Sequence, residues 1–190
     1  MNEPERRLLR TDPPKATGRQ ISGIAARFNT RSENLGTAAR PFHEIILPGA
    51  FDDVLRNDVI ACVNHDEKMI LARSRDGTGT LSLWVDEIGL RYSFEAPQTT
   101  AGNDILESIK RADIDASSFA FSIAENGDTY APEGGGTLRT ICEVGRLFDV
   151  SPVSRAAYPS TIVSVRSLSV RPPESFSAVS IWSRFFDILR

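Results

Sequence analysis

Apolar and polar positions alternate along residues 115–123, Asp-Ala-Ser-Ser-Phe-Ala-Phe-Ser-Ile, as they do in a short β-strand. Side chains of a strand point alternately to its two faces, so Phe119 and Phe121 share one face while Ser118 and Ala120 share the other. The aromatic face is expected to enter a core. The small, polar face leaves room for another group to approach the Ser118 hydroxyl, although an ordinary half-buried strand with a solvated face has the same pattern.

Similar patterns elsewhere predict a mainly β (α+β) domain with two substantial helices and a third helix in the C-terminal tail. Strands are expected over 19–28, 43–47, 59–63, 81–85, 90–96, 138–144, 147–153 and 161–165. A helix is expected over 49–56, because Phe51, Val54 and Leu55 share a face after Pro48. A second is expected over 102–111, with Thr100 or Asn103 as its cap.

The two ends of the chain differ from this middle region. Residues 1–18 are polar and lack a periodic apolar face, which predicts a flexible N-terminal arm. Arg171-Pro172-Pro173 is a linker, and apolar residues then recur every three to four positions, which predicts an amphipathic helix. That helix is expected to pack on its own domain or to enter a groove of another protein. The predicted organisation is therefore an arm over 1–18, a folded domain over 19–167 and a tail over 168–190.

Length, composition and charge narrow the class of protein. A chain of 190 residues with 41% hydrophobic residues can bury one core, so a single domain with tails is expected. The formal net charge of −3, without a strongly basic patch, gives no electrostatic case for a nucleic-acid partner. No apolar run approaches the length of a membrane span, and no signal-like region follows the charged start, so a protein that is neither membrane-bound nor secreted is expected.

Neither the cysteines nor the glycine run suggests a cofactor or a metal. Cys62 and Cys142 each lie in an apolar, strand-like run, which predicts two buried, reduced thiols and not a disulfide or a metal site. The run 134–136, Gly-Gly-Gly, lacks the lysine and the strand-to-helix context of a phosphate-binding loop. We expect it to connect two strands of a hairpin.

The chain contains only 2 histidines, which limits the search for a general base. His65 follows the apolar run 59–63, and strand ends are where rigid scaffolds present chemistry. His43 begins its strand, where a surface or capping role is favoured. Further along, Asp149 is a single carboxylate within the otherwise apolar segment 147–154, so it needs a partner if it is buried, and an imidazole is a natural one.

Several separated blocks carry a resemblance to a known family. The blocks are Pro48-Gly49-Ala50-Phe51, Asn64-His65-Asp66, Ser118-Phe119-Ala120-Phe121 and Asp149-Val150-Ser151-Pro152-Val153, followed by Ala157-Tyr158-Pro159. In this order, over roughly residues 21 to 167, they resemble the prohead (capsid maturation) serine proteases of tailed bacteriophages. That family is in turn similar to assemblin, the herpesvirus assembly protease.

The resemblance implies a fold, an activity and a site. It implies a bent or closed antiparallel β-barrel surrounded by helices, as in assemblin, and a serine endopeptidase without a cofactor or metal. Carried over by position, Ser118 is the nucleophile, His65 the general base and Asp149 the third member, where assemblin has a second histidine. The chain departs from the family pattern at Arg155-Ala156. Backbone donors for the oxyanion are expected from the segment just after Asp149, with Arg155 as a support.

The resemblance also implies a substrate and a place of action. The expected substrate is the major capsid protein or its scaffolding segment, together with the protease itself. The expected location is the bacterial host cytoplasm, inside the assembling prohead. A homo-oligomer is compatible with the resemblance, whereas a nucleic-acid or membrane partner is not expected.

Other interpretations of the same residues predict different chemistry. A noncatalytic capsid assembly or scaffolding factor would keep the β-rich domain as a binding platform, with Ser118 and His65 as ordinary strand residues. A cysteine hydrolase using Cys62 or Cys142 is disfavoured, because both thiols are expected to be buried. Asp66 is not expected to reach its neighbour's ring, since adjacent residues of an extended chain point to opposite sides. The pair Asp86-Glu87 lies in a turn and is expected to be solvated.

Overall fold

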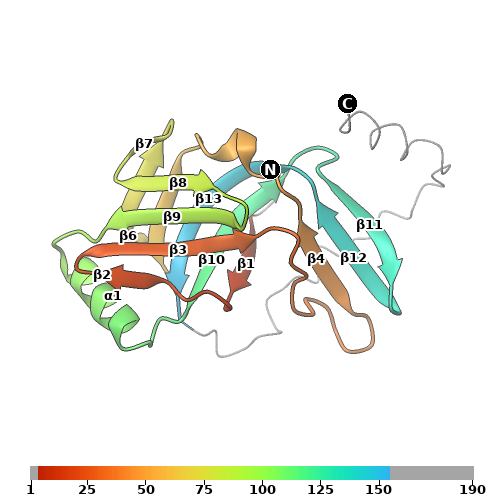
Figure 1. The fold of residues 1–190 in the computed structure, drawn as a ribbon, viewed down its shortest axis with the longest axis horizontal. Helices are drawn as coiled ribbons and strands as arrows, with labels where there is room; N and C mark the ends of the chain where they lie inside the picture. The colour runs from red at the N-terminus through yellow and green to blue at the C-terminus, as the bar shows by residue number, and fades with distance from the viewer. Residues whose placement is uncertain (1–3, 155–190) are drawn as a thin grey trace. The chain divides into compact units, whose positions relative to one another are not determined.

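The computed structural model describes residues 4–154, and these residues form three β-sheets and one α-helix (Figure 1). The sheets have the strand orders β1-β10-β13-β5-β6-β7, β2-β3-β9-β8 and β11-β12-β4. The strands are β1 (Glu5–Leu9), β2 (Lys15–Thr17), β3 (Gln20–Arg27), β4 (Phe42–Ile46), β5 (Val59–Val63), β6 (Asp66–Arg75), β7 (Thr78–Gly79), β8 (Leu81–Val85), β9 (Gly89–Glu95), β10 (Ala116–Ile123), β11 (Asp128–Glu133), β12 (Gly136–Ile141) and β13 (Val144–Val153). The helix is α1 (Thr100–Lys110), and a short 3-10 helix, η1, spans Asp52–Val54.

The four-stranded sheet lies across one face of the six-stranded sheet, where β3 contacts β10 and β13 (Figure 1). The core between them is largely aromatic, with Phe119 and Phe121 of β10 facing Tyr92 and Phe94 of β9, all of them buried. The two sheets are also joined by a buried hydrogen bond of 2.8 Å between the Tyr92 hydroxyl and Ser117 Oγ. The predicted strand with an aromatic core face is therefore confirmed. Its other face, which carries Ser118, points away from the four-stranded sheet.

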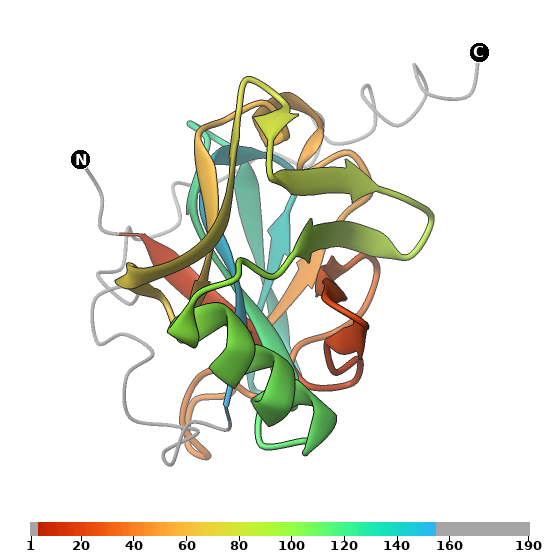
Figure 2. The same ribbon diagram turned by 90° about the vertical axis from the view of Figure 1, so that its left-hand side faces the viewer.

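Helix α1 lies at one end of the packed sheets (Figure 2). Its apolar stripe, Ile105, Leu106 and Ile109, is buried, as the sequence pattern predicts. Thr99 is the N-cap, because its side-chain oxygen accepts a hydrogen bond of 3.2 Å from the Gly102 amide. The predicted helix over 102–111 is confirmed, but it begins earlier and its cap is not Thr100 or Asn103.

The expected bent or closed antiparallel barrel surrounded by helices is wrong. β1 and β7 are the two edges of the six-stranded sheet and do not pair with each other, so this sheet does not close on itself. Two pairs of adjacent strands are parallel, namely β13 with β5 in the six-stranded sheet and β12 with β4 in the three-stranded sheet. Alternation of apolar residues predicts which face of a strand is buried, but it contains no information about which strands pair or whether a sheet closes.

The helix expected over 49–56 is also wrong. This segment forms turns and the short 3-10 helix η1, although Phe51 and Val54 are buried as their spacing suggests. Gly49 has a φ of 87°, in the left-handed region, so the chain cannot enter a right-handed helix at this residue. The remaining residues are too few to complete several i→i−4 hydrogen bonds, and 3-10 geometry is common in such short pieces.

Residues 1–18, expected to be a flexible arm, contain strands β1 and β2. β1 pairs antiparallel with β10, with Leu8 opposite Ser118. β2 pairs antiparallel with β3. Strand pairing uses backbone groups, so a polar segment can join a sheet edge without an apolar periodicity of its own. Strand β1 of the N-terminal segment therefore lies beside β10, the strand that carries Ser118.

The glycine run forms the turn of a hairpin between β11 and β12, as expected. Gly134 and Gly135 have φ values of 56° and 80°, and a two-residue hairpin turn of type I′ requires positive φ at both positions. The predicted hairpin from 81–85 to 90–96 is confirmed as β8 and β9.

Two sequence-based expectations lie outside the described residues, namely the strand over 161–165 and the amphipathic helix of the tail. Within residues 4–154, no helix has the length and apolar character that crossing a membrane requires.

Candidate active site

Ser118 lies on β10, the second strand from one edge of the six-stranded sheet, which has neighbours on both sides. β10 pairs with β1 on one side and with β13 on the other, and Ser118 is opposite Leu8 and Ser151. The next residue on the same face is Ala120, which is opposite Asp149. Because alanine is small, the Asp149 side chain has room on the same face of the sheet as the serine.

His65 occupies the tight turn between β5 and β6. Val63 pairs with Asp66, so only Asn64 and His65 form the loop, and both have positive φ, 53° and 61°. Two-residue hairpins favour this conformation because its twist matches that of the strands, and asparagine and histidine tolerate it better than most residues. The turn projects the imidazole from the end of a buried strand.

Asn64 attaches this turn to the end of β13. Its backbone amide donates to the carbonyl oxygen of Pro152 at 3.2 Å, and its side-chain oxygen accepts from the Ser154 amide at 2.9 Å. Since β13 also carries Asp149, these bonds fix the histidine turn relative to the carboxylate.

Asp149 is positioned on β13 beside an irregularity in the ladder. Asp149 pairs with Ala120, but Leu147 pairs with Phe121, so Phe148 is an extra residue that bulges from the strand. Bulges bend a strand and change the direction of nearby side chains. Asp149 is nearly buried and is directed towards the imidazole of His65, which supplies the partner that its burial requires.

The imidazole of His65 bridges the other two residues. Its Nδ1 is 2.7 Å from Asp149 Oδ1, and its Nε2 is 2.6 Å from Ser118 Oγ. An ionised carboxylate can only accept hydrogen bonds, so Nδ1 carries the proton in the Asp149 contact. With neutral His65, Nε2 is then free to accept the Ser118 proton. The structure thus brings together the three residues that the sequence singled out, from two strands and a turn.

A backbone carbonyl of β1 competes for the serine proton. Ser118 Oγ is also 2.8 Å from the carbonyl oxygen of Arg7. A hydroxyl has one proton, so Ser118 donates either to Arg7 or to His65. Only the second arrangement prepares the hydroxyl for attack on an electrophile. The sequence offered no signal for this contact, because residues 1–18 lack a strand pattern.

Comparison with known proteins now identifies the family. The family model described as caudovirus prohead serine protease matches residues 8–174. The chain belongs to this family. No curated protein matches it significantly. Among solved structures, it is similar to the bacteriophage T4 capsid assembly protease gp21, with a TM-score of 0.51 and 14% identity, over 81% of this chain and 100% of that one. This second likeness shows a shared fold.

The predicted activity class is therefore confirmed, since the prohead proteases of tailed phages are serine proteases. The alternative of a noncatalytic scaffolding factor gains no support from the family or from the fold.

The other candidate residues of this prohead protease make their hydrogen bonds elsewhere. Asp66 accepts a hydrogen bond from the Lys68 amide at 2.9 Å, within its own strand. His43 Nδ1 lies 3.0 Å from the carbonyl oxygen of Ser32. Asp86 accepts from the backbone of its own turn. None of these groups reaches Ser118.

The two cysteines differ from each other, contrary to the prediction that both are buried. Cys62 is buried, and burial raises the pKa of its thiol to about 11, so it is neither exposed nor ionised at neutral pH. Cys142 is exposed, because it follows β12 at the point where the chain turns towards β13. Neither thiol has an imidazole partner in the described residues, which leaves the cysteine hydrolase without its base.

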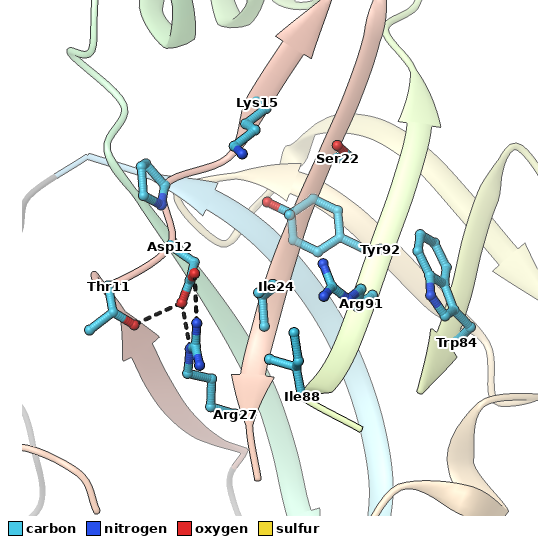
Figure 3. A pocket seen from close by; sticks show the side chains of 12 residues that line it. Thr11, Asp12, Lys15, Ser22, Ile24, Arg27, Trp84, Ile88, Arg91 and Tyr92 are labelled. Carbon is cyan, nitrogen blue, oxygen red and sulfur yellow. Dashed lines mark hydrogen bonds and ion pairs between the residues drawn. The ribbon is translucent and has the colours of Figure 1, made fainter. Parts of the chain in front are cut away.

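A pocket of about 580 Å³ lies elsewhere, on the outer side of β3 and β9 (Figure 3). Its lining includes Trp84 and Ile88, and in it Asp12 is paired with Arg27. Ser118, His65 and Asp149 do not line this pocket. Within residues 4–154, no group of three or more histidine, cysteine or carboxylate side chains is arranged to hold a metal ion.

Proposed function

We propose that this prohead protease cleaves peptide bonds with Ser118 as nucleophile, His65 as general base and Asp149 as the residue that orients and stabilises the imidazole. The observation that carries the proposal is the double bridge of His65, at 2.6 Å to Ser118 Oγ and 2.7 Å to Asp149 Oδ1. Both distances lie within the range at which a base takes a proton from a nucleophile and a carboxylate holds the base.

The reaction follows from this arrangement. His65 Nε2 takes the Ser118 proton as Oγ attacks the peptide carbonyl carbon, and Asp149 stabilises the imidazolium that forms. The same proton then passes to the leaving amine, which departs and leaves an acyl-enzyme. Water repeats the cycle and releases the acid. Backbone donors to the oxyanion are expected from the segment just after Asp149, with Arg155, which lies outside the described residues, as a support.

For the substrate, we propose the major capsid protein or its scaffolding segment, and the protease chain itself, inside the assembling prohead in the bacterial host cytoplasm. Membership of the prohead protease family supports this proposal. The similar T4 protein is a capsid assembly protease by its own description. Confinement with the substrate would raise its effective concentration and favour cleavage by an otherwise weak enzyme.

Co-expression with the capsid protein encoded beside it tests the proposal. Wild-type protease is expected to shorten the capsid protein or itself, whereas Ser118→Ala leaves both intact, as measured by intact mass. Ser117→Ala is the matched control, because Ser117 is the adjacent buried serine on the opposite face, bonded to Tyr92. Equal trimming by wild type and Ser118→Ala would exclude Ser118 as the nucleophile.

We also propose that the protease forms a homo-oligomer at the concentrations reached inside a shell. Cleavage rate measured against protease concentration tests this: a rate per molecule that rises with concentration supports it, and a constant rate contradicts it.

A further inference from the structure

A second serine of β13, Ser151, contacts the carboxylate of the proposed triad. Ser151 Oγ donates to Asp149 Oδ1 at 2.8 Å, and the residue is fully buried. Ser151 lies two residues after Asp149 on the same strand, so both side chains point to one face. Ser151 is also directly opposite Ser118 in the β10–β13 ladder. It therefore lies on the same face of the sheet as Ser118 and Asp149, but it is buried.

Donors and acceptors can be assigned in only one consistent way to the hydrogen bonds around Asp149 and Ser151. Asp149 Oδ1 receives two of them, from His65 Nδ1 and from Ser151 Oγ, and an ionised carboxylate has no proton to give. The single proton of Ser151 is therefore used, and its oxygen is left as an acceptor. Cys62 Sγ lies 3.2 Å from that oxygen, so the thiol is the donor. The raised pKa of Cys62 keeps its proton in place at neutral pH.

We infer that Ser151 is a positioning residue: it fixes the Asp149 carboxylate by donating to the oxygen that accepts from His65, and Cys62 supports it from β5. The inference rests on the proposed function of the triad. An aspartate carboxylate rotates readily about its last torsion angle, so a second donor on Oδ1 limits that rotation. A fixed carboxylate in turn holds the imidazole at the angle from which Nε2 meets Ser118.

The test compares Ser151→Ala with Ser117→Ala in the full chain. Both changes delete one buried hydroxyl from neighbouring strands, but Ser117 bonds to Tyr92 in the core between the sheets. In Ser151→Ala, kcat is expected to fall about 10- to 100-fold with KM nearly unchanged, because a hydrogen bond to a charged orienting group is lost. Ser117→Ala is expected to keep the wild-type kcat. Thermal unfolding of both variants controls for a general loss of folding.

A spectroscopic measurement separates positioning from a structural effect. The chain has 2 histidines, so imidazole NMR of ¹⁵N-histidine protein resolves His65 with His43 as an internal reference. The His65 Nδ1–H resonance is expected to move and broaden in Ser151→Ala. It is expected to move less in Cys62→Ala, where Ser151 still donates to Asp149 but no longer accepts a hydrogen bond from the thiol. The His43 resonances stay in place.

Wild-type kcat and an unmoved His65 resonance in Ser151→Ala would overturn the inference, as would equal changes in Ser117→Ala. If Ser151→Ala does not fold, an unmoved His65 resonance in Cys62→Ala overturns it. If the proposed catalytic triad is wrong, Ser118→Ala still cleaves the substrate. The His65 resonance reports the Ser151 contact whether or not cleavage occurs, so failure of the proposed function and failure of this inference are distinguishable.

Discussion

Asp149 is nearly buried, and its side chain contacts the imidazole of His65 and the hydroxyl of Ser151. Its Oδ1 accepts from His65 and from Ser151, so this oxygen has two protein donors. The sequence showed that this carboxylate needed a partner. Which partner it has depends on a turn 84 residues earlier in the chain, and no local pattern links the two.

Asp149→Asn is expected to abolish most activity while keeping the fold. The amide is the same size as the carboxylate, but it can donate to Nδ1, which places the imidazole proton on Nε2 and leaves no acceptor for Ser118. We expect kcat to fall by about 10³- to 10⁴-fold, as the same change does in the chymotrypsin-type triad. Steady-state kinetics on a peptide substrate measure this. Near wild-type kcat would show that Asp149 does not determine the tautomer.

Asn64→Ala and Asn64→Gly separate two roles of the histidine turn. Alanine at a φ of 53° is strained and also loses the bond to the Ser154 amide, so we expect a loss of about 1–3 kcal/mol of unfolding free energy and a lower kcat. Glycine adopts this φ freely and loses only the bond, so it should be less damaging. Denaturant unfolding and kinetics compare the two variants. A glycine variant as damaged as the alanine variant would show that the side-chain bond, not the backbone, holds His65.

At the scale of elements, a buried charge network holds β1 against the rest of the domain. Arg7 of β1 and Arg139 of β12 share the carboxylate of Glu44 on β4, and both also contact Glu5 of β1. Asp128 of β11 completes the set by pairing with Arg139. The network thus joins the edge strand that carries the Arg7 carbonyl to all three strands of the smallest sheet.

Arg139→Met is expected to destabilise the domain far more than Arg73→Met. The side chains of Arg139 and Glu44 are 4% and 3% exposed. The change removes one of the two arginine partners of Glu44 and of Glu5, and the arginine that pairs with Asp128, so it should cost about 3–5 kcal/mol of unfolding free energy. Arg73 pairs with Asp58 at 46% and 34% exposure, where an ion pair contributes about 0–1 kcal/mol. Denaturant unfolding measures both. Similar losses in the two variants would contradict the importance of the buried network.

At the scale of the whole molecule, the network makes the stability of the domain depend on acidity. Burial alone would raise the Glu5 pKa, but the hydrogen bond from Arg139 and the charges of Arg7 and Arg139 outweigh it and hold the pKa below its ordinary value of 4.5. Because the folded-state value is the lower one, the contribution of Glu5 is complete above about pH 4.5 and is lost as the pH falls through the folded-state pKa.

Glu5→Gln should therefore flatten the acid side of the stability curve. Wild-type Tm is expected to fall steeply as the pH drops below 4.5, and the variant, already less stable at neutral pH, should lose less on acidification. Thermal unfolding monitored by circular dichroism over this range compares them. Parallel curves for the two proteins would show that other carboxylates account for the acid sensitivity.

The sequence by itself determined the β class, the core face of β10 and the hairpin of β8 and β9, and it singled out Ser118, His65 and Asp149 as the candidate site. These features depend on alternation, turn residues and family blocks, all of which are local. Tertiary structure alone decided that the sheets stay open, that residues 1–18 contribute strands, that Arg7 contacts Ser118 and that Ser151 contacts Asp149. The reason is that strand pairing and buried polar contacts join backbone and side-chain groups across long stretches of chain, where each partner has an ordinary local pattern.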